Sequence, residues 1–274
     1  MNVTFVGGGN MATALIGGLV ATGADAREFR VVEPFDAQQH KLRARFAGIG
    51  IFSEATAGAV EGADLIVIAV KPQQAREAAQ AIASYIDEGA VVMTIAAGVR
   101  IADLSRWLGD YPRIVRAMPN TPALVSAGIS GVFAPPQVDE AGRALATRVL
   151  EAVGAVIWVE REDMLDAVTG ISGSGPAYAF YFLEGLEDAA RELGFSAENA
   201  RKLAYATFAG AIKLAQMSDD APATLRAQVT SKGGTTERAV SVLEAHAVKA
   251  TFVEAVKAAA LRATELGDEI AKKN

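Results

Sequence analysis

The chain of 274 residues contains no cysteine and only two histidines, His40 and His246. The lack of cysteine excludes disulfides, thiolate nucleophiles and thiolate-bound metals. Zinc and related metals are otherwise held mainly by histidine, and two histidines do not make a typical site. We therefore expect no metal site, and we assign no role to either histidine.

Long hydrophobic runs and blocks of basic residues are also missing. The first residues, MNVTFVGGGNMA, carry no positive segment, and later apolar stretches are short or broken by glycine, proline and charge, so no signal peptide or membrane span is predicted. Lys and Arg total 26 against 32 Asp and Glu, which gives a net charge of −6 and argues against a nucleic-acid partner. We expect a cytoplasmic protein.

Hydrophobic residues make up 51% of the chain, enough for two modest cores. Up to about residue 160, short apolar runs alternate with Ala-rich stretches of helical period, which predicts β-α units on a mostly parallel, doubly wound sheet of Rossmann type. The runs rich in β-branched residues are the expected strands: Val3–Val6, Phe29–Val32, Asp64–Ala69, Ala90–Ile95, Arg113–Ala117, Ile129–Phe133 and Val156–Val159.

Strand signals vanish after Glu160, and segments such as Ser196–Met217 and Val248–Lys272 have apolar residues at helical spacing. The sequence therefore predicts two domains, a dinucleotide-binding domain over 1–160 and an all-helical domain over 161–274.

Some segments of the second half, such as Tyr178–Leu186 and Phe252–Leu261, are apolar over much of a helix circumference. A buried interface between subunits would explain this excess, and we expect a homo-oligomer. The alternative is a self-contained helical bundle. Trp107, Trp158 and the aromatic residues of the first segment are expected in core or interface packing.

Gly7, Gly9 and Ala12 form the pattern G-x-G-x-x-A between the first expected strand and a helix from Asn10 to about Thr22. Gly7 permits a tight turn, Gly9 lets the backbone approach a pyrophosphate, and the small Ala12 lets helix and strand pack closely. The helix N-terminus offers free N–H groups to phosphates. The alternative is a merely flexible glycine loop.

Glu33 ends the second expected strand, 21 residues beyond Ala12. An acidic side chain at this place accepts hydrogen bonds from a ribose 2′-hydroxyl and repels a 2′-phosphate, which by itself favours NADH. The alternative is that Glu33, which is followed by Pro34, points into solvent.

Two further strand ends border the same expected crevice. The segment Ala69-Val70-Lys71-Pro72 ends one strand, and its proline is suited to the first turn of the next helix. Thr94-Ile95-Ala96-Ala97-Gly98 ends another strand with small residues that leave room for a flat ring, although they also fit a simple turn.

Three segments follow these motifs in order: Met118-Pro119-Asn120-Thr121-Pro122, Gly170-Ile171-Ser172-Gly173-Ser174-Gly175-Pro176-Ala177-Tyr178, and Val229 to Val240, which contains Ser231-Lys232-Gly233-Gly234-Thr235-Thr236. Together with the G-x-G-x-x-A pattern and the Ala69-Val70-Lys71-Pro72 segment, they resemble pyrroline-5-carboxylate reductase over essentially the whole chain. The Ser-Lys-Gly-Gly-Thr-Thr segment is the most specific, since the first-half motifs also fit relatives such as the hydroxyacid dehydrogenases.

The resemblance implies an NAD(P)H-dependent reduction of 1-pyrroline-5-carboxylate to L-proline, the last step of proline biosynthesis. It also implies a homodimer with interlocking helical domains, often assembled into a ring of dimers. Most members of the family prefer NADPH and commonly accept NADH. Here Glu33-Pro34 stands where many NADPH-preferring members have Ser, Asn or Arg, which argues against a strict NADPH preference.

The resemblance also assigns site residues by motif. For the cofactor, it implies that the pyrophosphate is held by Gly7, Gly8, Gly9, Asn10, Met11 and Ala12. The nicotinamide half is assigned to Ala69, Val70, Lys71, Pro72, Ala96 and Ala97. Asn120 is assigned a polar position that faces the cofactor, and Thr56 a position near the adenosine ribose. For the substrate, it implies that Ser231, Gly234 and Thr235 bind the carboxylate and that Thr236 binds the ring nitrogen. Many members have Pro in place of Lys232, so the lysine side chain is not expected to be indispensable.

A cyclic imine carboxylate needs a group that holds its carboxylate and a hydride donor at its C=N carbon, and it needs no nucleophile. The turn before the expected helix Thr236–Ala245 suits a carboxylate through hydrogen bonds and the helix dipole, although Thr235 or Thr236 is also an ordinary N-cap candidate. If the substrate enters as the iminium, no acid is required. If it enters as the neutral imine, Thr236 is the hydroxyl we nominate as the catalytic group, with Lys71 as a less favoured acid.

Two other functions stay open at this point. One is a reductase of the same architecture that acts on another small cyclic imine or 2-oxo acid derivative. The other is a non-catalytic NAD(P)-binding regulator, which the intact Ser231–Thr236 turn argues against because a sensor does not need a carboxylate site.

Overall fold

The computed structural model describes residues 1–272, and the chain forms two compact units. The first unit comprises Met1–Ser174 together with residues 258–272, and the second comprises Gly175–Lys257. These limits differ from the expected division at 160/161, because helical residues 164–173 and the end of the last helix belong to the first unit. The functional division into 1–160 and 161–274 stays a prediction.

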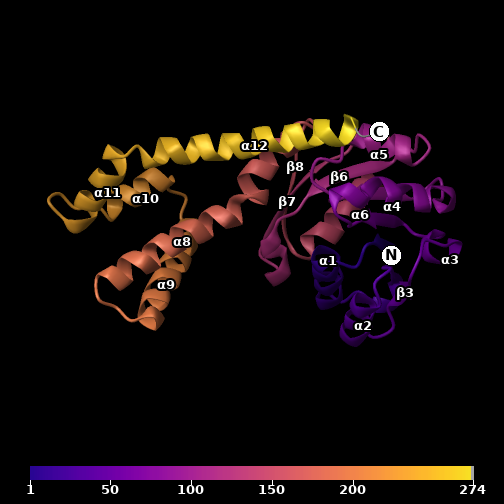
Figure 1. The fold of residues 1–274 in the computed structure, drawn as a ribbon, viewed down its shortest axis with the longest axis horizontal. Helices are drawn as coiled ribbons and strands as arrows, with labels where there is room; N and C mark the ends of the chain where they lie inside the picture. The colour runs from indigo at the N-terminus through magenta and orange to yellow at the C-terminus, as the bar shows by residue number, and fades with distance from the viewer. Residues whose placement is uncertain (273–274) are drawn as a thin grey trace. The chain divides into compact units, whose positions relative to one another are not determined.

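The first unit is built on an eight-stranded sheet in the order β3-β2-β1-β4-β5-β6-β7-β8. Figure 1 labels β3, β6, β7 and β8 of this sheet. Neighbouring strands are parallel except for the pair β6 and β7, so the predicted mostly parallel sheet is confirmed. The strands are β1 Val3–Val6, β2 Phe29–Val32, β3 Gly50–Phe52, β4 Leu65–Ile68, β5 Val91–Thr94, β6 Ile114–Met118, β7 Gly128–Phe133 and β8 Gly154–Trp158. Seven were expected; β3 was missed because it has three residues, one of them glycine.

Helices cover both faces of this sheet. Residues of α1, α2 and α6 pack into one hydrophobic cluster, and residues of α3, α4 and α5 into another. The α-helices of the unit are α1 Asn10–Ala21, α2 Asp36–Arg45, α3 Ala57–Val60, α4 Ala75–Ile82, α5 Ile101–Trp107, α6 Glu140–Glu151 and α7 Met164–Val168. Short 3₁₀ segments lie at Ala26–Glu28, Pro72–Gln74, Ala83–Tyr85 and Thr121–Val125, and a π-helical segment lies at Thr169–Gly173.

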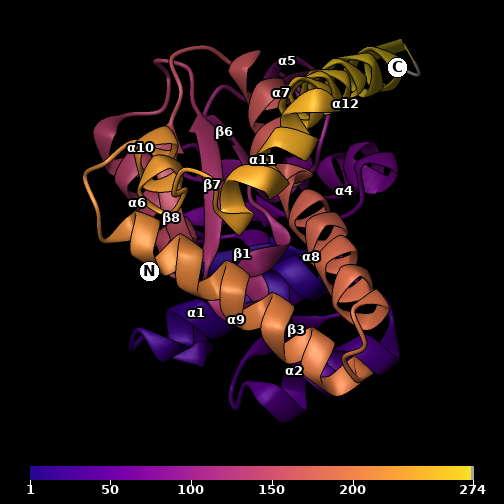
Figure 2. The same cartoon turned by 90° about the vertical axis from the view of Figure 1, so that its left-hand side faces the viewer.

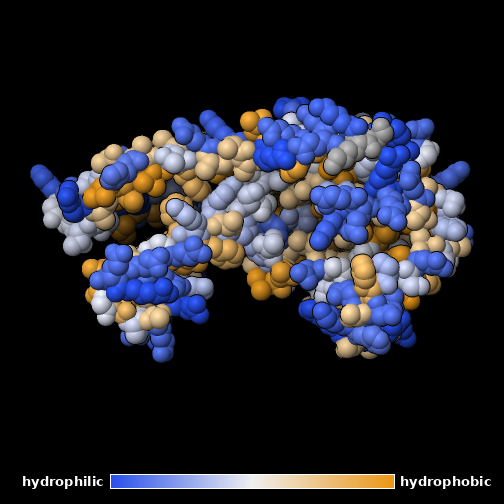
Figure 3. All heavy atoms as spheres, in the orientation of Figure 1, coloured by the Kyte–Doolittle hydropathy of each residue, from blue (hydrophilic) through white to orange (hydrophobic). Residues whose placement is uncertain are grey.

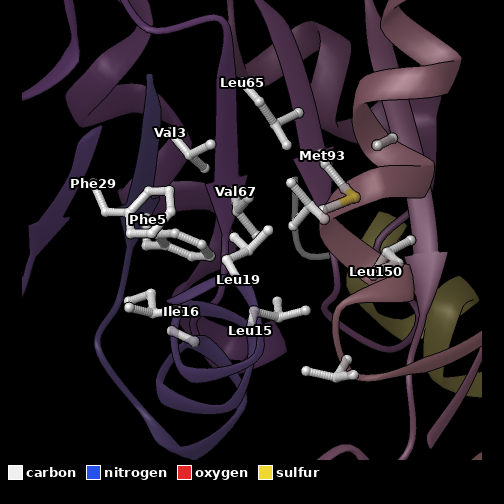
Figure 4. Packing of buried hydrophobic residues seen from close by; sticks show 14 of the residues in the cluster. Val3, Phe5, Leu15, Ile16, Leu19, Phe29, Leu65, Val67, Met93 and Leu150 are labelled. Atoms are coloured by element: carbon white, nitrogen blue, oxygen red, sulfur yellow. The ribbon is translucent and has the colours of Figure 1, made fainter. Parts of the chain in front are cut away.

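Successive strand residues face opposite layers, so each strand feeds both clusters. Phe5 and Val67 belong to the first cluster, whereas Val6 and Ile68 belong to the second. Figure 4 shows the first cluster, where side chains of α1 point towards those of β1 and β4. The Phe5 and Phe29 rings pack edge to face, with their centroids 6.4 Å apart. A sheet buried on both faces explains why its strands read as continuous apolar runs.

Both tryptophans lie in the first unit. Trp107 is buried in the second cluster, and the Trp158 indole Nε1 donates to Thr147 Oγ1 at 3.0 Å beneath the Arg143 guanidinium. The predicted packing role of these two residues fits their positions.

A charged network joins the end of the chain to the first unit. The buried Arg116 of β6 forms ion pairs with Glu162 at 3.2 Å and Asp166 at 2.9 Å. The second carboxylate oxygen of Asp166 accepts from Thr264 Oγ1 at 3.0 Å. Since Thr264 lies on the last helix, α12 (Val248–Lys272), this network helps to place residues 258–272 in the first unit.

The second unit contains helices alone among its residues 175–257, as predicted for this part of the chain. They are α8 Gly175–Glu192, α9 Ala197–Gln216, α10 Pro222–Gln228, α11 Thr235–Ala245 and the first turns of α12. Helices α8 and α9 pack against each other as a hairpin, which Figure 2 shows from the side. The helix expected at Ser196–Met217 is α9, with the Ser196 side chain as its N-cap and Met217 as its C-cap.

The second unit leaves most of its hydrophobic side chains uncovered. Across residues 175–257, the buried hydrophobic residues are three alanines, Ala190, Ala200 and Ala204. Large side chains such as Phe180 and Tyr181 are 59% and 72% exposed, and hydrophobic residues come to the surface of this unit in Figure 3. Within residues 1–272, none of the helices is both long and apolar enough to cross a membrane.

Candidate functional site

A cleft of about 410 Å³ lies at the carboxyl ends of the central strands of the first unit. The strand order reverses between β1 and β4, and crevices for nucleotides form at such reversal points in open α/β sheets. The cleft is lined by residues that follow four strands and by one side of α4: Val6, Gly7, Gly9, Val32, Glu33, Pro34, Phe35, Ser53, Glu54, Ala55, Ala69, Val70, Lys71, Gln74, Glu77, Ala78 and Ala81.

Gly7 makes the tight turn that leaves β1. Its φ is +99°, a conformation that favours glycine, and a Cβ atom here would lie 2.8 Å from Val70 Cγ1 and 2.9 Å from the Ala69 carbonyl oxygen. The Gly7 N–H donates to the Val32 carbonyl at 2.8 Å. The first glycine of the motif therefore joins the ends of β1, β2 and β4 without a side chain in between.

Gly9 is the N-cap of α1 and offers no side chain to its first turn. A Cβ atom at Gly9 would meet nothing within 4 Å, so the backbone faces open space on the cleft side. Ala12 is fully buried in the first cluster, and Asn10 and Met11 form the first turn above it. An open backbone at the N-terminus of a helix of 12 residues fits the pyrophosphate of a dinucleotide.

Glu33 is 6% exposed, which contradicts the alternative that it points into solvent. One carboxylate oxygen accepts from the Gly8 N–H at 2.9 Å, and the other accepts from the Phe35 N–H at 3.0 Å. The side chain thus connects the glycine loop to the turn that follows β2, and it still lines the cleft.

The segment after β4 borders the cleft on its other side. The Ala69 N–H donates to the Val6 carbonyl at 2.8 Å, and Ala69, Val70 and the exposed Lys71 line the cleft. Pro72 opens the 3₁₀ segment before α4, as its sequence position predicted.

Nine of the expected cofactor residues lie outside the lining of this cleft: Gly8, Asn10, Met11, Ala12, Thr56, Pro72, Ala96, Ala97 and Asn120. Thr56 is half-buried at the N-cap position of α3, directly after the lining residues Ser53–Ala55. Ala96 is 4% exposed, with its N–H donating to Thr94 Oγ1 at 3.2 Å, and Ala97 follows it. Their proposed contacts with a cofactor stay predictions.

Asn120, expected to face the cofactor, is 9% exposed and bonded to the protein on both sides of its amide. Its Oδ1 accepts from the Ile129 N–H at 2.9 Å, and its Nδ2 donates to the Ser172 carbonyl at 3.1 Å. This amide connects the end of β6, strand β7 and the π-helical segment. Such segments are frequent at functional sites.

The Ser231–Thr236 turn lies in the second unit. Gly233 has a φ of +73°, which favours glycine, and a Cβ atom at Gly234 would crowd Ser231 Oγ and lie 3.0 Å from the Ser231 carbonyl oxygen, so a side chain there would force the Ser231 hydroxyl to move. Gly234, not a threonine, is the N-cap of α11 and contributes no side-chain cap, which corrects the alternative that Thr235 or Thr236 is the N-cap. Thr235 and Thr236 therefore begin the helix, and their hydroxyls are not used as its N-cap.

Comparisons with known proteins extend over nearly the whole chain. The pyrroline-5-carboxylate reductase of Pseudomonas aeruginosa is 42% identical over 268 residues, which is 98% of this chain and 97% of that protein.

The chain belongs to the pyrroline-5-carboxylate reductase family.

Further comparisons agree with this family. Residues 162–266 match the family model for pyrroline-5-carboxylate reductase dimerisation, and residues 2–98 match the model for coenzyme F420-dependent NADP oxidoreductases. A pyrroline-5-carboxylate reductase structure from Coxiella burnetii superposes with a TM-score of 0.90 at 38% identity, covering 97% of this chain and 98% of that one. The Plasmodium falciparum pyrroline carboxylate reductase, whose structure contains NADP, superposes with a TM-score of 0.86 at 27% identity over the same shares.

Membership in this family confirms the resemblance read from the motifs, and the fold class is confirmed with it. Sequence reasoning missed several cleft residues that have no motif of their own: Phe35, Ser53, Glu54, Gln74 and Glu77. Ser53 comes directly after β3 and Phe35 follows the end of β2 by three residues, so the position of a strand end was the available signal.

Proposed function

We propose that this chain reduces the C=N bond of 1-pyrroline-5-carboxylate with NADH or NADPH to form L-proline. The observation that carries this proposal is the 42% identity to a pyrroline-5-carboxylate reductase across 98% of the chain, together with the dinucleotide-type cleft at the sheet reversal. The Plasmodium falciparum relative with bound NADP supports a nicotinamide dinucleotide as the cofactor. When bound, this cofactor supplies the hydride.

The first unit holds the dinucleotide in this proposal. The loop from Gly7 to Ala12 faces the pyrophosphate, and the free N–H groups are those of the first turn of α1, because the Gly7 and Gly8 N–H groups donate to Val32 and Glu33. Ala69–Pro72 together with Ala96 and Ala97 border the nicotinamide half. Lys71 is exposed at the rim of the cleft, where an ammonium group attracts a phosphate. Asn120 acts through the Ser172 and Ile129 backbones that it holds.

The Ser231–Thr236 turn binds the substrate carboxylate. Helix α11 has eleven residues, and its first N–H groups and the hydroxyls of Ser231 and Thr235 are suited to an anion because no side-chain cap occupies the Gly234 position. Ser231 lies close to Gly234 in this turn, and a larger residue at position 234 would displace the Ser231 hydroxyl from this place.

Thr236 contacts the ring nitrogen of the C=N bond, whose carbon receives the hydride; the nitrogen needs a proton as well only if it enters unprotonated. An iminium substrate already carries its proton, so the Thr236 Oγ1 accepts a hydrogen bond from the ring N–H and orients the carbon towards the hydride donor. A neutral imine takes a proton from solvent during the reaction, with Thr236 as the donor on the path.

A homodimer completes the proposal. The second unit buries no large hydrophobic side chain among residues 175–257, and residues 162–266 match a dimerisation family. A groove of about 730 Å³ runs between α11 and α12, with Leu243 and Val253 at its surface. A second copy of the chain would cover such a surface. The proposal also includes assembly of the dimers into a ring and a cytoplasmic location of the protein.

The first test is oxidation of NADPH and NADH by the purified protein with 1-pyrroline-5-carboxylate, followed by absorbance and by proline formation. Proline is the expected product. A folded protein that binds a dinucleotide and forms no proline would instead favour another cyclic imine. A regulator without turnover would be stabilised against heat by NAD(P) and not further by proline, because only a bound ligand raises the melting temperature.

A second test removes the Thr236 hydroxyl. We expect Thr236→Ala to lower kcat about 10- to 100-fold, the size of losing one hydrogen bond to a charged group, with dinucleotide binding unchanged. Thr236→Ser should restore most of the rate. Ser241→Ala is the matched control, since Ser241 is an exposed hydroxyl on the same helix that donates to the Arg238 carbonyl. Unchanged rates in Thr236→Ala would remove Thr236 from the mechanism.

A further inference from the structure

We propose that this chain selects NADH over NADPH, and that the selecting group is a Glu33 carboxylate held in place by the peptide N–H groups of Gly8 and Phe35. The inference rests on the proposed dinucleotide cofactor and adds the preference between its two forms.

The position of Glu33 places it beside the adenosine ribose. It stands at the carboxyl end of β2, next to the glycine loop, where an acidic residue of a Rossmann unit meets the ribose 2′-position. Glu33 lines the cleft, and its carboxylate accepts the two backbone hydrogen bonds. Each carboxylate oxygen has a second acceptor position, so a 2′-hydroxyl can still donate to Glu33.

The two backbone bonds prevent Glu33 from turning away. An exposed carboxylate avoids an incoming phosphate by rotating into solvent, but Glu33 is 6% exposed and its two oxygens are held at 2.9 and 3.0 Å. Rotation would leave the N–H of the buried Gly8 unpaired, which is unfavourable. A 2′-phosphate would therefore meet a fixed negative charge.

The surroundings offer little to neutralise that phosphate. Three carboxylates line the cleft, those of Glu33, Glu54 and Glu77, against one ammonium group, that of Lys71. The sequence from Glu33 to His40 contains no Lys or Arg, and Lys71 is the one basic residue from Phe46 to Ala75. Recognition of a 2′-phosphate ordinarily uses a nearby arginine.

The same contacts make Glu33 a positioning residue for two other parts of the cleft. By holding Gly8, it fixes the loop between the two pyrophosphate-facing glycines, and a Cβ atom at Gly8 would lie 3.2 Å from its carboxylate. By holding the Phe35 N–H, it fixes a phenyl ring that is 67% exposed at the rim of the cleft. Loss of Glu33 should therefore weaken NADH binding as well as discrimination.

The test measures binding of NADH and NADPH to the full-length protein by titration calorimetry, without 1-pyrroline-5-carboxylate. For the natural sequence we expect Kd to be at least about tenfold lower for NADH, the size expected when a hydrogen bond to a charged group is replaced by charge repulsion. Glu33→Gln, which keeps the size and removes the charge, should reduce this ratio about tenfold or more. Equal Kd values for the two cofactors in the natural protein, or an unchanged ratio in Glu33→Gln, would overturn the inference.

Two further variants separate charge from position. Glu33→Asp keeps the charge on a side chain too short to make both backbone contacts, so we expect weaker NADH binding and a smaller ratio. Glu77→Gln is the matched control, because it removes an exposed carboxylate from the same cleft. We expect its ratio of NADPH to NADH Kd values to stay within about threefold of the natural ratio and to approach the natural ratio in high salt. An undiminished ratio in Glu33→Asp, or a Glu77→Gln effect as large as that of Glu33→Gln, would contradict selection by a held Glu33.

Circular dichroism of each variant verifies its fold, and the Asp variant keeps the test decisive if the Gln variant does not fold. Failure of both cofactors to bind the natural protein would count against the proposed function itself. Binding of both with equal affinity would count against the selection alone.

Discussion

The two units of this protein differ in what covers their hydrophobic side chains. In the first unit, β1, β2, β4 and β5 are almost completely buried between two helical layers, and Phe5 and Phe29 are fully covered. In the second unit, the buried hydrophobic residues among 175–257 are three alanines, while Phe180, Tyr181 and Leu243 are more than half exposed. The first unit has a core within one chain, whereas the second unit lacks one among residues 175–257, and the proposed homodimer would supply it.

Two helix starts show a second contrast, which does not follow the division into units, since α9 of the second unit is capped by Ser196 and α1 of the first unit has no side-chain cap. Helix α6 of the first unit is capped by Asp139, whose side chain accepts from the Gly142 N–H at 2.9 Å. Helix α11 of the second unit begins at Gly234, which has no side chain to cap it. A capped start adds stability, whereas an uncapped start keeps N–H groups available for a ligand.

The largest expected effect comes from the core of the first unit. Phe5→Ala should lower the free energy of unfolding of this unit by about 3–5 kcal/mol, because a large buried ring is replaced by a cavity. Urea unfolding followed by tryptophan fluorescence measures this unit alone, since Trp107 and Trp158 both lie in it. Phe180→Ala, at a residue 59% exposed, should change this value by less than about 1 kcal/mol. Equal losses of unfolding free energy in Phe5→Ala and Phe180→Ala would contradict the difference in core formation between the two units.

A charged side chain in the exposed groove should affect assembly instead of folding. Leu243 is 52% exposed and lines the groove between α11 and α12. We expect Leu243→Asp to weaken the dimer at least about tenfold in sedimentation equilibrium, since burial of an unpaired carboxylate is unfavourable. Val20→Asp, at an exposed apolar position of α1 in the first unit, should leave the assembly unchanged. A monomeric natural protein, or an unaltered dimer in Leu243→Asp, would show that the second unit is stable in its exposed form.

The smallest effect concerns the cap of α6 and depends on pH. The Gly142 N–H, and then the Arg113 guanidinium, hold the pKa of Asp139 below its usual value. Because the pKa is lower in the folded state, this carboxylate stabilises the fold above its unfolded pKa, about 4, and the stabilisation is lost as the pH falls through the folded pKa.

Asp139→Ala should therefore lower the melting temperature by a few degrees at pH 7 and by less in acid. Asp139→Asn keeps a capping group without the charge, and its melting temperature should lie between the other two. If the melting temperatures of Asp139→Ala and the natural protein differed by the same amount at pH 7 and at pH 3, the carboxylate charge would not contribute to stability.

Elements with strong local patterns were predictable. Seven of the eight strands were found, because strands buried on both faces are runs of β-branched residues, and α9 and α12 were found because their apolar residues recur at helical spacing. The short β3 has no such pattern. The π-helical segment Thr169–Gly173 was missed as well, and it is held by a hydrogen bond from Asn120, 52 residues earlier in the chain, which no local pattern indicates.

The motifs alone determined the family, the place of the glycine loop and the turn at Ser231–Thr236, because glycine positions and helix starts depend on local backbone geometry. Only the tertiary structure decided that the end of α12 belongs to the first unit, through Thr264 and Asp166. It also decided that the Glu33 carboxylate is held by Gly8 and Phe35. The contact of Thr264 with Asp166 joins residues 98 positions apart, and that of Gly8 with Glu33 joins residues 25 positions apart, so folding around the sheet brings each pair together. The contact of Phe35 with Glu33 spans 2 positions and is fixed by the burial of Glu33.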